Sequence, residues 1–205
     1  MITANEALQR LQEGNQRFVA GVRSIDTLVK QTQRKNFMER QAPFAIILGC
    51  SDSRVPAEII FDQGLGDLFV IRVAGNIVAP SQVGSVEFAA KKFGTPLVVV
   101  LGHSRCGAVA ATLEEIERPS DESSLNVLSI VSRIRPSVEL LLQTDLHNDP
   151  EALLKAAIRS NTLASTNSLR HGSEMLEQLI LDNRLTIVAA EYSLETGLVE
   201  FIDGV

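Results

Sequence analysis

Few of the features that mark membrane, secreted or nucleic-acid-binding proteins occur in this chain of 205 residues. No apolar run approaches the roughly 20 residues that cross a bilayer, and the N-terminal segment lacks the apolar core of a secretion signal. Acidic residues outnumber basic ones by 25 to 19, and the net charge of −6 offers no basic surface to nucleic acid or to an anionic membrane. We therefore expect a cytoplasmic protein that binds neither nucleic acid nor membrane.

Cysteine is scarce and tryptophan is absent: the only thiols are those of Cys50 and Cys106. At most one disulfide could form, and a lone disulfide is unusual in a chain without a secretion signal. Thiolate chemistry or metal binding is therefore the favoured use of both residues. The remaining composition, with 45% hydrophobic and 21% charged residues, is that of a globular protein, and we expect one domain over residues 1–205.

Short apolar runs alternate with helical segments along the chain. The runs are nearly continuous and rich in Val and Ile, which is typical of strands buried on both faces of a parallel sheet. They cover residues 44–49, 68–73, 97–101 and 185–190, and a segment at 197–202 alternates like an edge strand. The predicted helices cover 83–93, about 107–117, and a long stretch from 126 to 183 that Asn148-Asp149-Pro150 interrupts. This alternation predicts an α/β fold with a mostly parallel sheet flanked by helices.

Residues 1–40 form a predicted N-terminal helical arm. Between residues 3 and 20, apolar positions recur at helical spacing. Thr3 is a suitable N-cap, and Glu6 follows it three residues later, as in a capping box. A second, polar helix is predicted over about 27–40.

Two of the apolar runs end at residues that commonly bind metals. Cys50 directly follows the first run, and His103 and Cys106 follow the third, in the segment GHSRCG. Because the carboxyl ends of parallel strands meet at the edge where open sheets bind ligands, these side chains should converge there. Gly102 and Gly107 allow the backbone to turn tightly around the second pair. Two thiolates and one imidazole leave one position of a tetrahedral zinc ion open, which predicts one catalytic Zn²⁺ per chain.

An aspartate and an arginine crowd the turn after Cys50, in the segment CSDSR. Each feature also has an ordinary explanation, because a cysteine at a strand end is often only part of the core and an Asp–Arg pair is often a surface ion pair. Beside a metal, however, Asp52 could accept a hydrogen bond from the metal's water, and Arg54 could hold the carboxylate through a bidentate pair. The two half-sites together favour catalytic zinc over the ordinary explanations.

The segment CSDSR at 50–54, followed by GHSRCG at 102–107, closely resembles the β-class carbonic anhydrases. The resemblance extends from about residue 43 to 109, with further similarity in the N-terminal helices and at 185–199. It implies a sheet of strand order 2-1-3-4 with a fifth strand at the edge. It also implies a zinc lyase, carbonic anhydrase (carbonate dehydratase).

For the site, the resemblance implies that Cys50, His103 and Cys106 bind zinc and that Asp52 and Arg54 form a catalytic dyad. The implied reaction is the reversible hydration of CO2 to bicarbonate and a proton by zinc-bound hydroxide. Asp52 would accept the hydrogen bond of that hydroxide and direct its lone pair at CO2, while Arg54 holds Asp52. Two thiolates cancel the charge of Zn²⁺, so the water should be less acidified than in an all-histidine site, where its pKa is about 7. Activity should therefore favour alkaline pH.

The resemblance further implies that Gln41, Phe69 and Gly107 line the CO2 pocket, together with Phe88, where a tyrosine is often found. Members of the family form dimers in which each pocket borrows wall residues from the neighbour, and dimers pair further. A homodimer or homotetramer is therefore implied, with Gln41 and Phe88 reaching the pocket across the interface.

In some members of the family, the counterpart of Asp52 swings onto the zinc at low pH as a fourth ligand and closes the site. In the bicarbonate-inhibited members, a second anion pocket of a tryptophan, an arginine and a tyrosine supports this closed form. Here Ile47 stands in place of the tryptophan, whereas Arg72 and Tyr192 match the other two positions. Without the aromatic wall, we expect weak bicarbonate binding there and, at pH 8, an Asp52 that lies on Arg54.

Two other functions remain open at this point. The same zinc site could hydrolyse another small linear molecule, such as carbonyl sulfide or carbon disulfide, since residues that control access to the pocket decide between these substrates. A non-catalytic zinc-binding or redox protein would need a fourth protein ligand or reactive thiols. The chain has no third cysteine, and catalysis explains Asp52 better.

Overall fold

The computed structural model describes residues 2–32, 41–119 and 124–204. Its five-stranded sheet has the order β2-β1-β3-β4-β5, which confirms the order expected above. The first four strands are parallel, and the edge strand β5 runs antiparallel to β4. The strands are β1 (Ala45–Gly49), β2 (Leu68–Arg72), β3 (Leu97–His103), β4 (Thr186–Tyr192) and β5 (Val199–Asp203).

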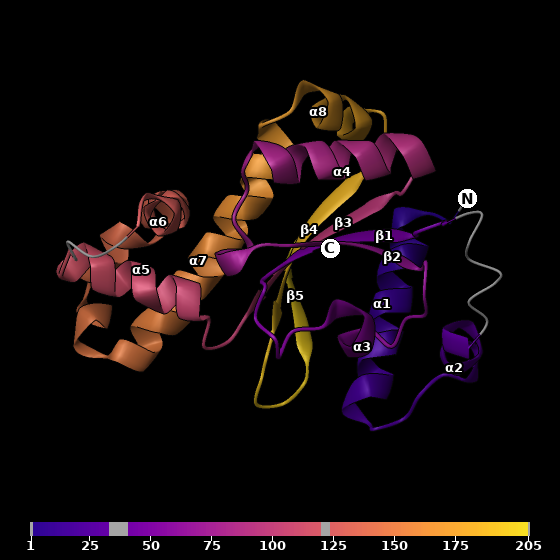
Figure 1. Cartoon of the computed structure of the whole chain (residues 1–205), viewed down its shortest axis with the longest axis horizontal. Coiled ribbons are helices and arrows are strands. Elements are labelled where there is room, and N and C mark those ends of the chain that lie inside the picture. Colours follow the sequence, from indigo (N-terminus) through magenta and orange to yellow (C-terminus); the bar gives the residue numbers. More distant parts are fainter. Residues whose placement is uncertain (1, 33–40, 120–123, 205) are drawn as a thin grey trace.

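Helices cover both faces of the sheet (Figure 1). Alternate residues of each central strand point to opposite faces, so Ile47 and Val99 pack with α1 and α3, while Ile46 and Val98 pack with α4 and α8. The helices are α1 (Ala4–Val19), α2 (Ile25–Thr32), α3 (Ala57–Ile60), α4 (Pro80–Phe93), α5 (Gly107–Glu117), α6 (Leu125–Val138), α7 (Pro150–His171) and α8 (Glu174–Leu181). Short 3₁₀ turns are η2 (Ala74–Asn76), η3 (Glu139–Gln143) and η4 (Asp145–Asn148).

A third group of buried side chains lies beyond the carboxyl ends of β1 and β3. It joins α5, α6 and α7, and it includes both cysteines of the chain, Cys50 and Cys106, together with Val109, Ile134 and Ile158. The two thiols are therefore placed where the sheet ends and this helical layer begins.

Where the structure describes the N-terminal arm, its helices agree with those predicted from the sequence. Thr3 caps α1, and its capping box with Glu6 is complete. The second predicted helix begins at Ile25, two residues earlier than expected, and its predicted part at 33–40 lies outside the described residues. Among the helices that are described, none is long and apolar enough to cross a membrane.

The long helical stretch divides into α6, α7 and α8. The predicted interruption is present: Asp149 is the N-cap of α7, its carboxylate accepts hydrogen bonds from two N–H groups of the first turn, and Pro150 is the first helical residue. Two further breaks were not predicted. They fall at the 3₁₀ turns that follow Val138 and at Ser173, which caps α8.

Candidate metal centre

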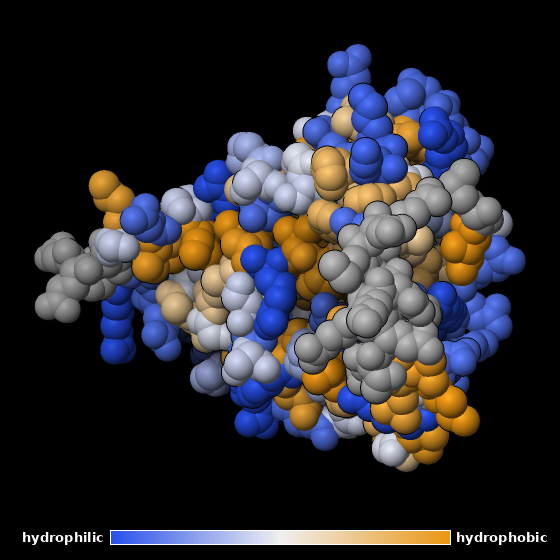
Figure 2. Space-filling model, turned by 45° about the vertical axis from the view of Figure 1, so that its right-hand side comes forward, coloured by the Kyte–Doolittle hydropathy of each residue, from blue (hydrophilic) through white to orange (hydrophobic). Residues whose placement is uncertain are grey.

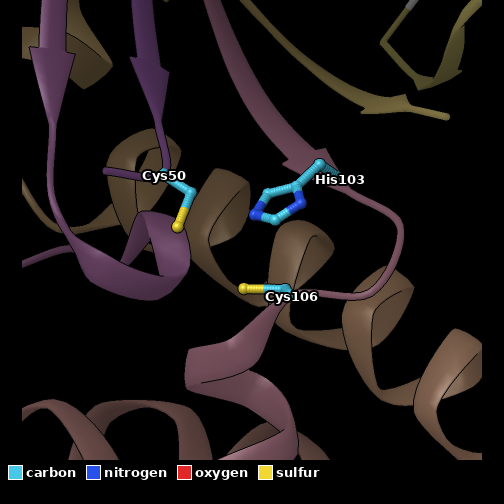
Figure 3. Close-up of side chains that lie close together, drawn as sticks. All are labelled: Cys50, His103 and Cys106. Atoms are coloured by element: carbon cyan, nitrogen blue, oxygen red, sulfur yellow. The ribbon is translucent and has the colours of Figure 1, made fainter. Parts of the chain in front are cut away.

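Neighbouring strands bring the three predicted ligands together. β1 and β3 pair in parallel with Gly49 opposite Leu101, so the two strands end at nearly the same level. Cys50 follows β1 directly, His103 is the last residue of β3, and Cys106 is the N-cap of α5. Their ligand atoms lie within 4.8 Å of one another, and all three side chains are buried. Figure 3 shows the two thiols and the imidazole converging from the three elements. These three residues can thus hold one metal ion between the two strands and the helix.

A tight turn links His103 to Cys106, and the loop between β4 and β5 holds it in place. Arg105 adopts a positive φ of 55°, a conformation that lets the chain reverse between strand and helix. The carboxylate of Glu195 accepts hydrogen bonds from Ser104 Oγ and Arg105 Nε, both at 2.7 Å. The Ser104 N–H donates to the carbonyl of Tyr192 at 2.9 Å. The turn is therefore anchored on the side away from Cys50.

The hydrogen bonding of His103 leaves one ring nitrogen ready to bind a metal. Its Nδ1 lies 2.9 Å from the carbonyl oxygen of Ser104, an acceptor, so Nδ1 carries the proton. Its Nε2 is buried and has no hydrogen-bond partner among the described residues. A buried lone pair without a partner is unfavourable unless a cation takes it. The orphaned Nε2 is the observation that tests the fit of a metal, and the fit is good.

The two thiols also suit a divalent cation. A hydrogen bond with Cys106 lowers the pKa of Cys50, while the same hydrogen bond raises the pKa of Cys106, because one thiolate stabilised by the other's S–H prevents a second ionisation. The N–H of Gly75 donates to Cys50 Sγ at 3.3 Å and supports the charged form. A divalent cation would offset the second negative charge, and two thiolates with one neutral imidazole are donors that Zn²⁺ prefers.

Asp52 and Arg54 form a bidentate ion pair beside the metal centre. Arg54 Nε lies 2.9 Å from Asp52 Oδ1, and Arg54 Nη2 lies 2.7 Å from Oδ2. The side-chain hydrogen bonds of Arg54 are the main cause that holds the pKa of Asp52 well below its usual range. The Asp52 side chain is only 17% exposed, whereas that of Arg54 is 53% exposed. The carboxylate is thus charged and turned inward, unlike that of an ordinary surface pair.

The predicted pocket residues divide into two groups. Gly107 directly follows Cys106, and a Cβ built on it would meet nothing within 4 Å, so space is open beside this ligand. Phe69 pairs with Ile46, four residues before Cys50, which places it about 13 Å from the metal edge at the usual rise of a strand. Its ring lies 6.3 Å from that of Phe88, which is 52% exposed.

Phe69 and Phe88 therefore do not border the metal centre of their own chain, and the exposed Gln41 precedes β1 at the same far end. The across-interface role of Gln41 and Phe88 and the pocket role of Phe69 therefore stay predictions.

The contacts that hold the ligands from outside were not predicted, although the sequence had already pointed to Arg72 for an anion pocket and, by resemblance, to Gly75 near the site. The guanidinium of Arg72 donates to the carbonyl oxygens of Cys50 at 3.0 Å and Asp52 at 2.5 Å, and so fixes the turn between them. Gly75 meets Cys50 as described, and Asn161 of α7 donates from Nδ2 to the Gly75 carbonyl at 2.8 Å. One signal could have pointed to Asn161: it belongs to a stripe of buried polar residues on α7, Asn161, Thr162, Ser165 and Thr166.

Comparisons with known sequences point to one enzyme family. A family model for carbonic anhydrase matches residues 45–199. The chain is 39% identical to a carbonic anhydrase of Mycolicibacterium smegmatis over 194 residues, which are 95% of this chain and 91% of the relative. It is also 39% identical to carbonic anhydrase 2 of Mycobacterium tuberculosis over 191 residues, 93% of this chain and 89% of the relative.

Solved structures show the same architecture. The β-carbonic anhydrase CcaA is similar with a TM-score of 0.77 at 28% identity, over 96% of this chain and 88% of that one. A tetrameric β-carbonic anhydrase of Sordaria macrospora has a TM-score of 0.71 at 21% identity, over 95% and 96% of the two chains, and shares the fold.

Proposed function

The chain belongs to the β-class carbonic anhydrase family, and from that premise we propose that it catalyses the reversible hydration of CO2 to bicarbonate and a proton. The observation that carries the proposal is the buried Cys50–His103–Cys106 group with its orphaned imidazole nitrogen, beside a charged Asp52. Zn²⁺ held by these three residues would supply the positive charge that lowers the pKa of a water molecule and makes a nucleophile available.

Asp52 orients the nucleophile. Its Oδ2 accepts one hydrogen bond from Arg54, and a carboxylate oxygen has a further lone pair with which to accept the O–H of the attacking oxygen. An O–H that points to Asp52 leaves a lone pair of the same oxygen free to attack the carbon of CO2. Arg54 holds the carboxylate by two hydrogen bonds, so that it stays ionised and in one orientation.

The proposal is tested by a stopped-flow CO2-hydration assay on purified full-length protein, with its zinc content measured by mass spectrometry. We expect one zinc per chain and hydration far above the buffer rate. Turnover of carbonyl sulfide is measured beside it on the same sample. A zinc-loaded protein that converts carbonyl sulfide but not CO2 would show that the substrate is wrong, and a zinc-free, inactive protein would show that the enzyme assignment is wrong.

We expect the protein to be a dimer or a dimer of dimers. Apolar side chains gather on and beside α2 in a single chain (Figure 2): Ile25 is 77% exposed, Val22 55% and Leu28 49%. Such a patch usually marks an interface. Light scattering at assay concentration measures the mass, and Ile25→Asp should shift it towards monomer and lower activity. Leu125→Asp changes an equally apolar, 85% exposed residue on α6 and should leave the mass unchanged. An active monomer would contradict this prediction.

We also expect bicarbonate to inhibit only as a competing product, without cooperativity. Arg72 already donates to two backbone carbonyls, and Ile47 is fully buried. Tyr192 is buried with its ring 6.5 Å from that of Phe18, and two strands separate β2 from β4. Ile47 thus gives Arg72 no aromatic neighbour in place of the tryptophan, and a second anion should bind weakly there. Initial rates over a series of bicarbonate concentrations check this, and a sigmoidal inhibition curve or bicarbonate bound beside Arg72 and Tyr192 would contradict it.

A further inference from the structure

Helix α7 passes beneath the metal centre. It approaches both the Cys50 side and the His103 side of that centre. Its ribbon, in faded orange, runs behind the three ligand side chains in Figure 3. Two consecutive residues near its middle, Asn161 and Thr162, are 2% and 0% exposed. A buried amide in the middle of a helix is unfavourable unless its polar atoms find partners. The partner of Asn161 connects this helix to a zinc ligand.

Asn161 and Cys50 form hydrogen bonds with opposite ends of the Gly75 backbone, its carbonyl and its N–H. Asn161 Nδ2 donates to the Gly75 carbonyl at 2.8 Å, and the Gly75 N–H donates to Cys50 Sγ at 3.3 Å. Between these two bonds the backbone of Gly75 has φ 71°, and Asn76 follows with φ 42°. Glycine adopts this left-handed conformation freely, and asparagine tolerates it better than most residues, so the conformation itself carries little strain. What the hydrogen bond from Asn161 fixes is the position of the Gly75 peptide relative to Cys50.

The same stretch of α7 fixes the strand end that carries His103. A Cβ built on Gly102 would lie 2.1 Å from Thr162 Oγ1, so the helix approaches the strand as closely as the missing side chain permits. Gly102 precedes His103, and Thr162 follows Asn161. The relative position of Cys50 and His103 therefore depends on two adjacent residues of one helix.

We propose that Asn161 is a positioning residue for the metal centre, which acts through Gly75 on the Cys50 thiolate. An N–H aimed at a thiolate compensates part of its negative charge and restricts where the sulfur lies, so the ligand is held in position for the metal. Without the amide, the Gly75 N–H leaves Cys50 Sγ and the Gly75–Asn76 turn relaxes. The proposal rests on the proposed function, because it takes zinc to be the ion that Cys50 binds.

The test replaces Asn161 by Leu, which keeps the volume but removes the hydrogen-bond donor. Zinc affinity is measured in the full-length protein by competition with a chelator, and the visible spectrum of the Co²⁺-substituted protein reports thiolate bonding and geometry. We expect zinc to bind about 10-fold to 100-fold more weakly, as for other partners of ligating residues, and the thiolate-to-cobalt band to shift. If Asn161→Leu does not fold, Asn161→Asp, with an acceptor in place of the donor, is measured in the same way.

Thr166→Val is the matched control. Thr166 is fully buried one turn further along α7, and its hydroxyl donates to the Thr162 carbonyl at 2.8 Å without touching the centre. The control should lower thermal stability but leave zinc affinity and the cobalt spectrum unchanged. A folded Asn161 variant with parental affinity and spectrum, or a control that changes both equally, overturns the proposal. These readouts do not depend on turnover: a parent that binds zinc without hydrating CO2 contradicts only the proposed function, and a parent that binds no zinc contradicts both.

Discussion

Replacing Cys106 by serine is expected to remove zinc and CO2 hydration together from a chain that still folds. The Cys106 side chain is 1% exposed, and its sulfur is one of only three ligand atoms in the cluster. A serine hydroxyl does not ionise near neutral pH and so cannot replace a thiolate, which leaves two ligands where zinc needs at least three. Zinc content per chain should fall close to zero, and CO2 hydration should fall to the buffer rate. Both are measured on the same sample.

Relative to the metal-free parent, the serine variant should lose only a small part of its free energy of unfolding. The two side chains differ by one atom, and burial of the hydroxyl at this helix N-terminus costs about 1–3 kcal/mol. Circular dichroism should therefore show native helix content. Thr112→Ser on the same helix is the control, since Thr112 is fully buried and its hydroxyl bond to the Ala108 carbonyl at 2.8 Å survives the change. Full zinc occupancy in Cys106→Ser would show that Cys106 is not a ligand.

The sheet and the positions of the ligands could be predicted because both depend on short-range patterns. Continuous Val- and Ile-rich runs identified every parallel strand, and the structure moves their bounds by only one or two residues. Ligand-type residues directly after two such runs must lie at one sheet edge once the strands are parallel, and the structure brings Cys50, His103 and Cys106 to that edge.

The breaks within residues 126–183 show where this reasoning stops. The segment ELLLQ at 139–143 keeps apolar residues that a continuing helix could bury, yet it forms a 3₁₀ turn after Val138. Pro136, the stronger breaking signal, lies inside α6 and does not end it there. Tertiary packing, which a local pattern does not contain, decides between these outcomes.

The outer contacts of the metal centre could not be predicted for a related reason. Asn161 is 86 residues from Gly75 along the chain, and Glu195 is 91 residues from Ser104. Asparagine and glutamate side chains are as common at exposed positions and helix caps as in buried hydrogen bonds, so their residue types do not reveal these roles. Their roles follow only from the pairing of distant elements, here α7 with η2 and the β4–β5 loop with the turn before α5.

The second large effect is expected from Asp52→Asn, which should keep zinc and lose most CO2 hydration. The substitution preserves shape, and Asp52 is outside the Cys50–His103–Cys106 group, so metal content should stay at one per chain. An asparagine is uncharged, and its Nδ2 donates where the nucleophile's O–H needs an acceptor. Its pairing with Arg54 also loses the attraction of opposite charges. We expect kcat to fall by about 100-fold or more, the range of a lost proton acceptor at a reacting centre.

Asp149→Asn separates this effect from a general loss of negative charge. Asp149 caps α7 at an exposed site, and asparagine caps helices about as well, so the control makes the same chemical change and should keep full activity. Stopped-flow rates and zinc content are compared for the parent and both variants. If Asp52→Asn binds zinc and turns over like the parent, then the ion pair of Asp52 with Arg54 only orders the turn after Cys50, and the oxygen that attacks CO2 is oriented by another group. If activity falls while zinc stays, a loss of metal cannot explain the result, and Asp52 is the acceptor that directs the nucleophile.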